Sequence, residues 1–309
     1  MRTLAKVVLL LVALSAVALA QAPPGVADRA RREGTLALYT SLAPTESQPL
    51  ADAFEKKYGV KVQLWRALSE EVVQRTITEA KGHRYSVDVI ETNGPEMEMI
   101  GREKLLAAPW TPDRLNLFVV GYNTTKVKRA EIPASYEGFA DPKWKGRIAL
   151  EATDSEWMAT LIKTSPGDKG MALMRKLAAL QPALRKGHVL LASLVAAGDV
   201  PVGLAMYNSN IETLKRKGAP IDYVPVQPVV ARPQGIGVAK NAPHPNAAQL
   251  FNDYVLSPEG QKLFESMGRT PAKVTSQSNS FRFTLIDPIT VLDESAKWDK
   301  VWNDLFVRR

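Results

Sequence analysis

Strand-like and helix-like segments alternate along nearly the whole chain, and this order limits the fold more than any other feature. In the first part of the chain, strands are expected at residues 35–40, 60–64 and 87–91, and helices at 46–58 and around 73–80. The strand candidates are short and apolar, whereas the helix candidates repeat apolar side chains every three or four residues. This order is typical of an open α/β sheet with mostly parallel strands.

The same alternation restarts in the middle of the chain. Strands are expected at 117–122, 147–151, 202–207, 221–226 and 235–239, and helices at 154–163, 169–180, 189–197, 210–217, around 247–255 and at 291–306. No internal repeat, low-complexity tract or Ser/Gly linker separates the halves. Two α/β units without a flexible linker predict two lobes that are joined by direct crossovers.

Residues 1–20 have the composition of a secretory signal peptide. A basic start with Arg2 and Lys6 precedes an apolar run over 7–19, and the segment ends in Ala18-Leu19-Ala20. The run is shorter than the roughly 20 apolar residues that a bilayer-spanning helix needs. An uncleaved membrane anchor is the alternative. We expect removal of residues 1–20 and export of the protein to a bacterial periplasm.

Composition excludes several classes of site. The sequence has no cysteine, so disulfides, thiolate metal sites and cysteine nucleophiles are excluded. The formal net charge is +8, but the basic residues are scattered and no aromatic side chains accompany them for base stacking. We therefore expect no nucleic-acid partner.

The sequence also lacks a Ser/His/Asp order and a Gly-rich phosphate loop, which favours a binding protein over an enzyme. A secreted enzyme remains an alternative.

Polar residues follow the predicted strands at the places where an open α/β sheet binds its ligand. In such sheets the ligand lies in the crevice outside the carboxyl ends of the strands. The predicted ligand-binding residues are Tyr39, Thr40, Ser41, Glu91, Asn93, Thr153, Asp154, Ser155, Tyr207 and Asn208. Short polar residues at such turns also bond their own backbone, which is the alternative role for most of them.

For Glu156 and Arg232, which lie near this predicted crevice, a structural role is the alternative to ligand binding. The run from Thr153 to Glu156 matches a capping box, in which the Thr hydroxyl and the Glu side chain satisfy free backbone N–H groups, and we favour this role for Glu156. Arg232 could pair with a carboxylate or phosphate, or lie in solvent at a hinge. His83, His188 and His244 show no spacing typical of metal ligands.

Five segments in order resemble the extracellular solute-binding proteins of ABC importers, family 1, in the branch that binds ferric iron. These segments are 34–41, 50–62, 85–91, 141–148 and 241–261. The resemblance implies an α/β, two-lobed periplasmic-binding-protein fold of type II, in which each lobe is a mainly parallel sheet flanked by helices and hinge crossovers join the lobes. The expected first lobe comprises 21–115 and 236–282, and the second comprises 116–235 and 283–309.

The resemblance also implies a function. The protein would be the periplasmic substrate-binding component of an ABC importer, a monomer that captures a small solute between its lobes and delivers it to a membrane permease. A sensory module that signals to a membrane receptor is the alternative. No cofactor is expected.

The ferric site of the resembling family is incomplete in this sequence. Relatives typically hold Fe3+ with two adjacent tyrosines after the strand that corresponds to 202–207, and here only Tyr207 is present. The stretch after the first strand has no histidine, and Glu91 lies about two places early, with Asn93 in the expected position. Tyr207 is thus a metal ligand only if the transported ligand is Fe3+. A small organic acid, phosphonate or amine remains an equal alternative.

Overall fold

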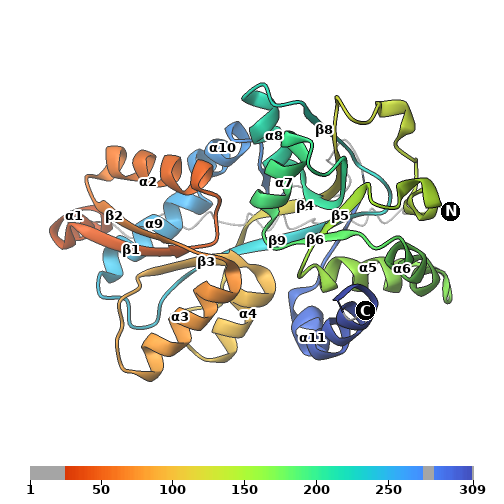
Figure 1. Ribbon diagram of the computed structural model, residues 1–309. Helices are drawn as coiled ribbons and strands as arrows, with labels where there is room; N and C mark the ends of the chain where they lie inside the picture. Colours follow the sequence, from red (N-terminus) through yellow and green to blue (C-terminus); the bar gives the residue numbers. More distant parts are fainter. Residues whose placement is uncertain (1–24, 274–281, 308–309) are drawn as a thin grey trace, which may run out of the picture.

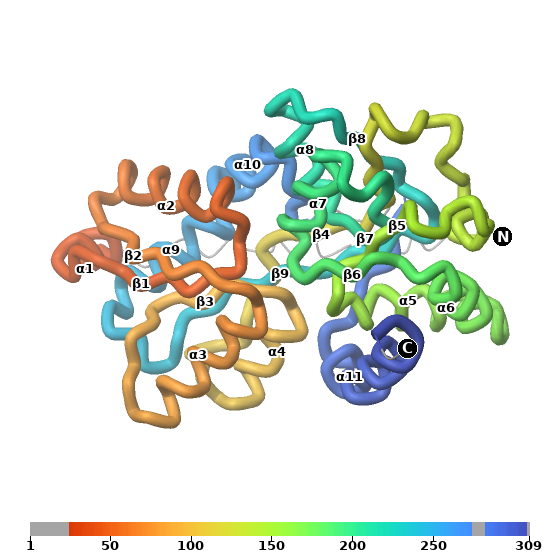
Figure 2. The backbone as a smooth tube through the Cα atoms, viewed as in Figure 1, coloured from red at the N-terminus to blue at the C-terminus, as the bar shows by residue number. Residues whose placement is uncertain are grey.

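The protein is described here by a computed structural model that covers residues 25–273 and 282–307 (Figure 1). The expected signal peptide lies outside the described residues. Helices surround one continuous sheet, and the molecule divides into two lobes that lie side by side in Figures 1 and 2. In this part of the chain, no helix is both long and apolar enough to cross a lipid bilayer.

The first lobe contains the early part of the chain together with two later helices, drawn in blue (Figure 2). Its elements are α1 (Val26–Glu33), β1 (Thr35–Thr40), α2 (Pro44–Tyr58), β2 (Lys61–Arg66), α3 (Ser69–Lys81), β3 (Val89–Asn93), α4 (Gly94–Arg102), α9 (Pro245–Leu256) and α10 (Pro258–Ser266). β1 pairs in parallel with both β2 and β3. Their carboxyl ends therefore lie at the same edge of the sheet.

The second lobe repeats this arrangement. Its elements are β5 (Ile148–Glu151), α5 (Ser155–Thr164), α6 (Lys169–Ala179), β6 (Ala183–Arg185), α7 (His188–Ala197), β7 (Val202–Tyr207), α8 (Asn208–Arg216), β8 (Ile221–Val224) and α11 (Pro288–Trp302), with 3-10 turns at Arg129–Glu131, Tyr136–Ala140 and Pro142–Trp144 and a π turn at Asn303–Val307. β5 pairs in parallel with β6 and β7.

Two long strands connect the lobes. β4 (Thr111–Asn123) and β9 (Val229–Val238) run antiparallel, with Leu115 opposite Pro233. β9 continues beside β3 in the first lobe, and β4 continues beside β7 and β8 in the second. Two short strands extend this pair: β10 (Thr270–Pro271) pairs with β4, and β11 (Phe283–Leu285) pairs with β9.

The main path of the sheet is therefore β2-β1-β3-β9-β4-β7-β5-β6. Parallel strands form each half, and the antiparallel β4 and β9 join the halves. This architecture confirms the expected α/β fold, and the expected lobe boundaries stay a prediction.

Each lobe has its own apolar core. In the first lobe, Phe54 of α2 packs against Phe251 of α9, with ring centroids 4.9 Å apart. In the second, Trp144 and Trp157 are fully buried in one large cluster, which Trp298 of α11 also joins. Full burial of a large apolar side chain contributes about 1.5–3 kcal/mol, so each lobe is stabilised mainly from within.

Three of the described α-helices, α1, α4 and α10, were not among the expected ones. α4 begins at Gly94, directly after the end of β3. Pro95 is tolerated there because the N–H that it lacks would be unpaired in the first helical turn. α10 begins with Pro258 after Ser257, whose hydroxyl oxygen accepts the Gly260 N–H at 3.2 Å. A serine followed by a proline is a typical sequence signal for the start of a helix, so the start of α10 was predictable from the sequence.

Candidate ligand-binding site

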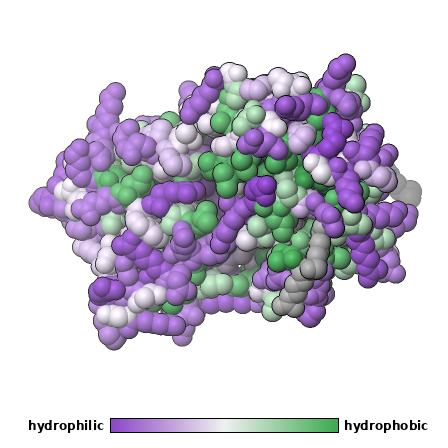
Figure 3. Space-filling view, in the orientation of Figure 1, coloured by the Kyte–Doolittle hydropathy of each residue, from purple (hydrophilic) through white to green (hydrophobic). Residues whose placement is uncertain are grey.

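A cavity of about 1230 Å³ lies between the lobes, at the carboxyl ends of the parallel strands. Side chains of both lobes line it, among them Ser69 of α3 and His188 of α7, and Arg232 of β9 lies at its back. In Figure 3, hydrophilic surface predominates over the first lobe, whereas apolar surface gathers over the second lobe near α7. There Val189 and Leu190, both exposed, also line the cavity.

Half of the predicted ligand-binding residues line this cavity. Ser41 and Asn93 lie on the side of the first lobe, and Thr153, Ser155 and Tyr207 lie on the side of the second. They come from the ends of four strands that are far apart in the sequence. The rule that ligands bind at the carboxyl ends of parallel strands therefore places these five side chains around one space.

The other five are not among the residues that line this cavity. Tyr39 donates its hydroxyl to Glu79 of α3 at 2.9 Å. Thr40 donates to Glu91, which lies opposite it in the register of β1 and β3, inside the sheet. Side chains alternate between the two faces of a strand, so Thr40, the direct neighbour of Ser41, points elsewhere. Tyr39 and Glu91 lie in β1 and β3, one pleat before Ser41 and Asn93.

Asp154 and Asn208 are the other two predicted residues that do not line the cavity. Asn208 is the first residue of α8 and is buried. Asp154 is fully buried behind the lining, where its Oδ1 lies 3.2 Å from His188 Nε2 and accepts a hydrogen bond from Arg232 at 3.1 Å. Asp154 thus orients two residues that do line the cavity.

The capping interpretation of Thr153 and Glu156 is wrong. The Thr153 hydroxyl donates to Glu151 Oε2 at 2.7 Å, and the Thr153 N–H donates to the same oxygen at 2.6 Å. Glu156 forms an ion pair with Arg232. The carboxylate is drawn to the buried guanidinium because a full charge outcompetes the partial charge of a helix N-terminus.

Arg232 is buried, so its placement in solvent at a hinge is also excluded. Besides Asp154 and Glu156, it contacts the Tyr207 hydroxyl, to which it donates. Burial raises the pKa of Tyr207 well above its usual value, and the charges of Asp154 and Glu151 raise it further. Tyr207 is therefore held as a neutral phenol next to a cation.

His188 stacks on Tyr207, with ring centroids 3.7 Å apart and planes 21° apart. Burial alone would lower the pKa of His188, but the charge and hydrogen bond of Asp154 give a net rise. His188, Asp154 and Glu151 bring one possible metal-ligand atom each within 4.8 Å of one another. Sequence spacing gave no sign of this group, because 37 residues separate Glu151 from His188 and only the fold joins them.

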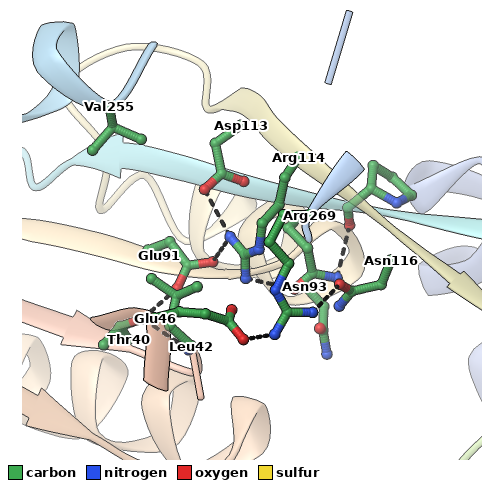
Figure 4. Close-up of polar contacts among 12 residues, drawn as sticks. Thr40, Leu42, Glu46, Glu91, Asn93, Asp113, Arg114, Asn116, Val255 and Arg269 are labelled. Atoms are coloured by element: carbon green, nitrogen blue, oxygen red, sulfur yellow. Dashed lines mark hydrogen bonds and ion pairs between the residues drawn. The ribbon is translucent and has the colours of Figure 1, made fainter. Parts of the chain in front are cut away.

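A buried charged network lies beside the cavity (Figure 4). Arg114 Nη1 of β4 lies 2.6 Å from Glu91 Oε1 and 2.7 Å from Asp113 Oδ2, and all three side chains are at most 3% exposed. Gln234 of β9 accepts from Arg114 Nη2 at 3.5 Å. The network thus ties β3, β4 and β9 together at the place where the chain crosses between the lobes.

Glu46 and Arg269 are two further lining residues that the sequence analysis missed. They form a buried ion pair between the first turn of α2 and the segment after α10. Figure 4 shows the Arg269 guanidinium directed between Glu46 and Asn116. No local pattern marks either residue, because more than two hundred residues separate them and the contact exists only in the folded chain.

A sequence profile of the family described as bacterial extracellular solute-binding protein matches residues 70–288. The chain belongs to this family. This solute-binding protein is 26% identical over 163 residues to the Iron uptake protein A1 of Synechocystis sp., a match that covers 44% of this chain and 43% of the relative. It is 22% identical over 274 residues to the Fe(3+)-binding periplasmic protein of Serratia marcescens, covering 78% and 79% of the two chains.

Its fold is shared with the periplasmic binding protein AfuA from Actinobacillus pleuropneumoniae, solved with exogenous fructose-6-phosphate bound. The TM-score is 0.72 at 21% identity, and the match covers 90% of this chain and 100% of AfuA. This likeness agrees with the two lobes and confirms the type II fold of this solute-binding protein.

Proposed function

We propose that this protein is the periplasmic substrate-binding component of an ABC importer. It acts as a monomer that captures a small solute between its lobes and hands it to a permease in the inner membrane. The observation that carries the proposal is the cavity of about 1230 Å³ that both lobes line. A space of this size lies above the range of about 300–1,000 Å³ that is common for small-molecule sites, as expected for a cleft that narrows on closure.

The connection between the lobes supports a closing motion. Among the residues that the structure describes, β4 and β9, with the short β10 and β11 beside them, link the two halves of the sheet. A rotation of the lobes therefore requires backbone changes in few residues, as in other hinged binding proteins. Closure would surround the solute and expose to the permease a surface that exists only in the loaded protein.

Three buried guanidinium groups in the lining favour a small organic anion as the solute, although acidic side chains line the cavity as well. Arg114, Arg232 and Arg269 are all buried and all line the cavity. Guanidinium groups bind carboxylates and phosphates through paired hydrogen bonds. The related fold of AfuA, which was solved with a sugar phosphate bound, supports the same class of solute.

Ferric iron is the second candidate, because relatives are named for iron and because Glu151, Asp154 and His188 lie together. The geometry around Tyr207 speaks against it. Arg232 donates a hydrogen bond to the phenol oxygen of Tyr207. A guanidinium beside the metal would also repel a trivalent cation. Two of the three clustered acceptors are also already engaged, Glu151 by backbone N–H groups and Asp154 by Arg232.

Thermal unfolding of the mature protein with added solutes tests the proposal. We expect fructose 6-phosphate, citrate or another small anion to raise the melting temperature and to give a colourless complex in titration calorimetry. If ferric citrate instead gives a visible absorption band that the Tyr207→Phe variant lacks, iron is the solute. If no small solute or metal raises the melting temperature, the transport function itself is refuted.

A further inference from the structure

Arg269 lies at the inner wall of the cavity, between elements of both lobes (Figure 4). Its side chain is 3% exposed and forms an ion pair with Glu46 of α2, which is equally buried. Asn116 Oδ1 of β4 lies 3.5 Å from its Nη1, and Asn210 Oδ1 of α8 lies 3.5 Å from its Nη2. All four residues line the cavity, so the guanidinium faces the space that holds the solute.

The other two buried arginines of the cavity have less capacity for a new partner. Arg114 contacts two carboxylates, and Arg232 contacts two carboxylates and a phenol. Among the described residues, Arg269 has one carboxylate within ion-pair distance. A guanidinium carries five N–H donors, and contacts of 3.5 Å are at the weak limit of a hydrogen bond.

We propose that Arg269 receives the anionic group of the solute and that Glu46 is an internal counter-ion which this group displaces. The inference rests on the proposed function, in which the solute is a small anion. In the empty protein Glu46 neutralises the buried guanidinium. A carboxylate or phosphate that enters the cavity replaces Glu46 as the partner of the Arg269 guanidinium and binds it through paired hydrogen bonds.

This exchange also links binding to lobe closure. Glu46 belongs to the first lobe, whereas Asn210 lies in the first turn of the second-lobe helix α8. When Arg269 is released from Glu46, it is free to hold the solute against the Asn210 side of the cavity. The solute then bridges the lobes through Arg269.

A counter-ion that competes with the solute has an unusual thermodynamic consequence. Replacement of Glu46 by glutamine leaves the guanidinium of the empty protein without its charged partner, and an unpaired buried charge destabilises the fold. The solute then restores that partner, so it binds more tightly than in the wild type. Stability of the empty protein and affinity for the anion therefore change in opposite directions. A purely structural ion pair would give lower stability with unchanged or weaker binding.

The test uses the full mature chain in titration calorimetry and thermal unfolding, with fructose 6-phosphate, citrate and inorganic phosphate as probes. The variants are Glu46→Gln and Arg269→Gln. Glu259→Gln is the matched control, because Glu259 of α10 pairs with Lys57 of α2 through an exposed ion pair outside the cavity.

We expect Glu46→Gln to melt at a lower temperature when empty and to bind the anion about tenfold more tightly, which corresponds to about 1.4 kcal/mol. Arg269→Gln should lose at least a hundredfold in affinity, and the control should bind like the wild type. If Arg269→Gln does not fold, Glu46→Gln still tests the proposal through its lower melting temperature and its tighter binding of the anion.

Two results would overturn the inference. If the wild type binds a probe anion and Glu46→Gln binds it equally or more weakly, the exchange is wrong while the proposed function stands. If the wild type binds none of the three anions but binds a diamine such as putrescine, the anionic solute of the proposed function fails together with the exchange.

Discussion

Removal of Arg114 should destabilise the protein strongly and in a pH-dependent way. In Arg114→Met, the carboxylates of Glu91 and Asp113 keep their burial, at 1% and 0% side-chain exposure, but lose a guanidinium that lies 2.6 and 2.7 Å away. Loss of one partner from a buried ion pair costs about 3–5 kcal/mol. For a chain of this size, that loss corresponds to a melting temperature lower by roughly 10 °C.

The pH dependence follows from the acids that are left behind. Burial raises the pKa of Asp113 from 3.8 to about 7 even though the charge of Arg114 lowers it, so removal of Arg114 moves this pKa further up. An acid whose pKa is higher in the folded state binds its proton more tightly there, and the folded state is favoured at low pH. Stability should therefore fall as the pH rises from about 4 to beyond 7, with a slope of at most about 1.4 kcal/mol per pH unit for each acid.

Urea unfolding followed by tryptophan fluorescence at pH 5 and pH 8 measures both effects. We expect a larger loss at pH 8, and recovery of most of it in the triple variant that adds Glu91→Gln and Asp113→Asn. Lys300→Met is the control, because its ion pair with Asp304 is exposed and such pairs contribute less than about 1 kcal/mol. An equal loss at the two pH values, or a triple variant no more stable than Arg114→Met, would refute the reasoning.

Three further variants test packing and surface charge. Gly260→Ala should destabilise the protein by about 1–3 kcal/mol in urea unfolding, since a Cβ there would lie 2.2 Å from the rigid Tyr254 carbonyl oxygen. A neutral result would show that α10 moves freely. Gly101→Ala lies in α4 with nothing within 4 Å of the new Cβ, so it should stabilise by about 0.5–1 kcal/mol; a lower unfolding midpoint would contradict this. Arg102→Ala removes an exposed ion pair to α11 and should change the melting temperature by no more than about 3 °C, whereas a large drop would mean that this contact holds α4 to α11.

The fold could be predicted because its signals are local. Apolar alternation and helical spacing located β1, α2 and β7 to within two residues of their observed bounds. The signals failed where proline interrupts an apolar pattern. β9 begins at Val229, but the strand was expected to begin only at residue 235, because Pro233 interrupts the apolar pattern before it. β9 tolerates this proline because Pro233 lies between the residues that pair with β11 (229–231) and those that pair with β3 (234–238), so on that side no partner strand accompanies it.

The site could be predicted only in part. The ends of the strands led to Ser41 and Tyr207, which both line the cavity, because the position of a strand end follows from the local sequence. Arg269 and His188 could not be found in this way. Their place depends on how the two lobes and their loops meet in space, and no short-range pattern contains that information.

The interleaving of the first lobe has a consequence for the order in which the chain can acquire its structure. Phe54 packs against Phe251 and Tyr254, which emerge from the ribosome after most of the second lobe, from β5 to β8. The amino-terminal region therefore stays without its hydrophobic complement until synthesis is nearly finished.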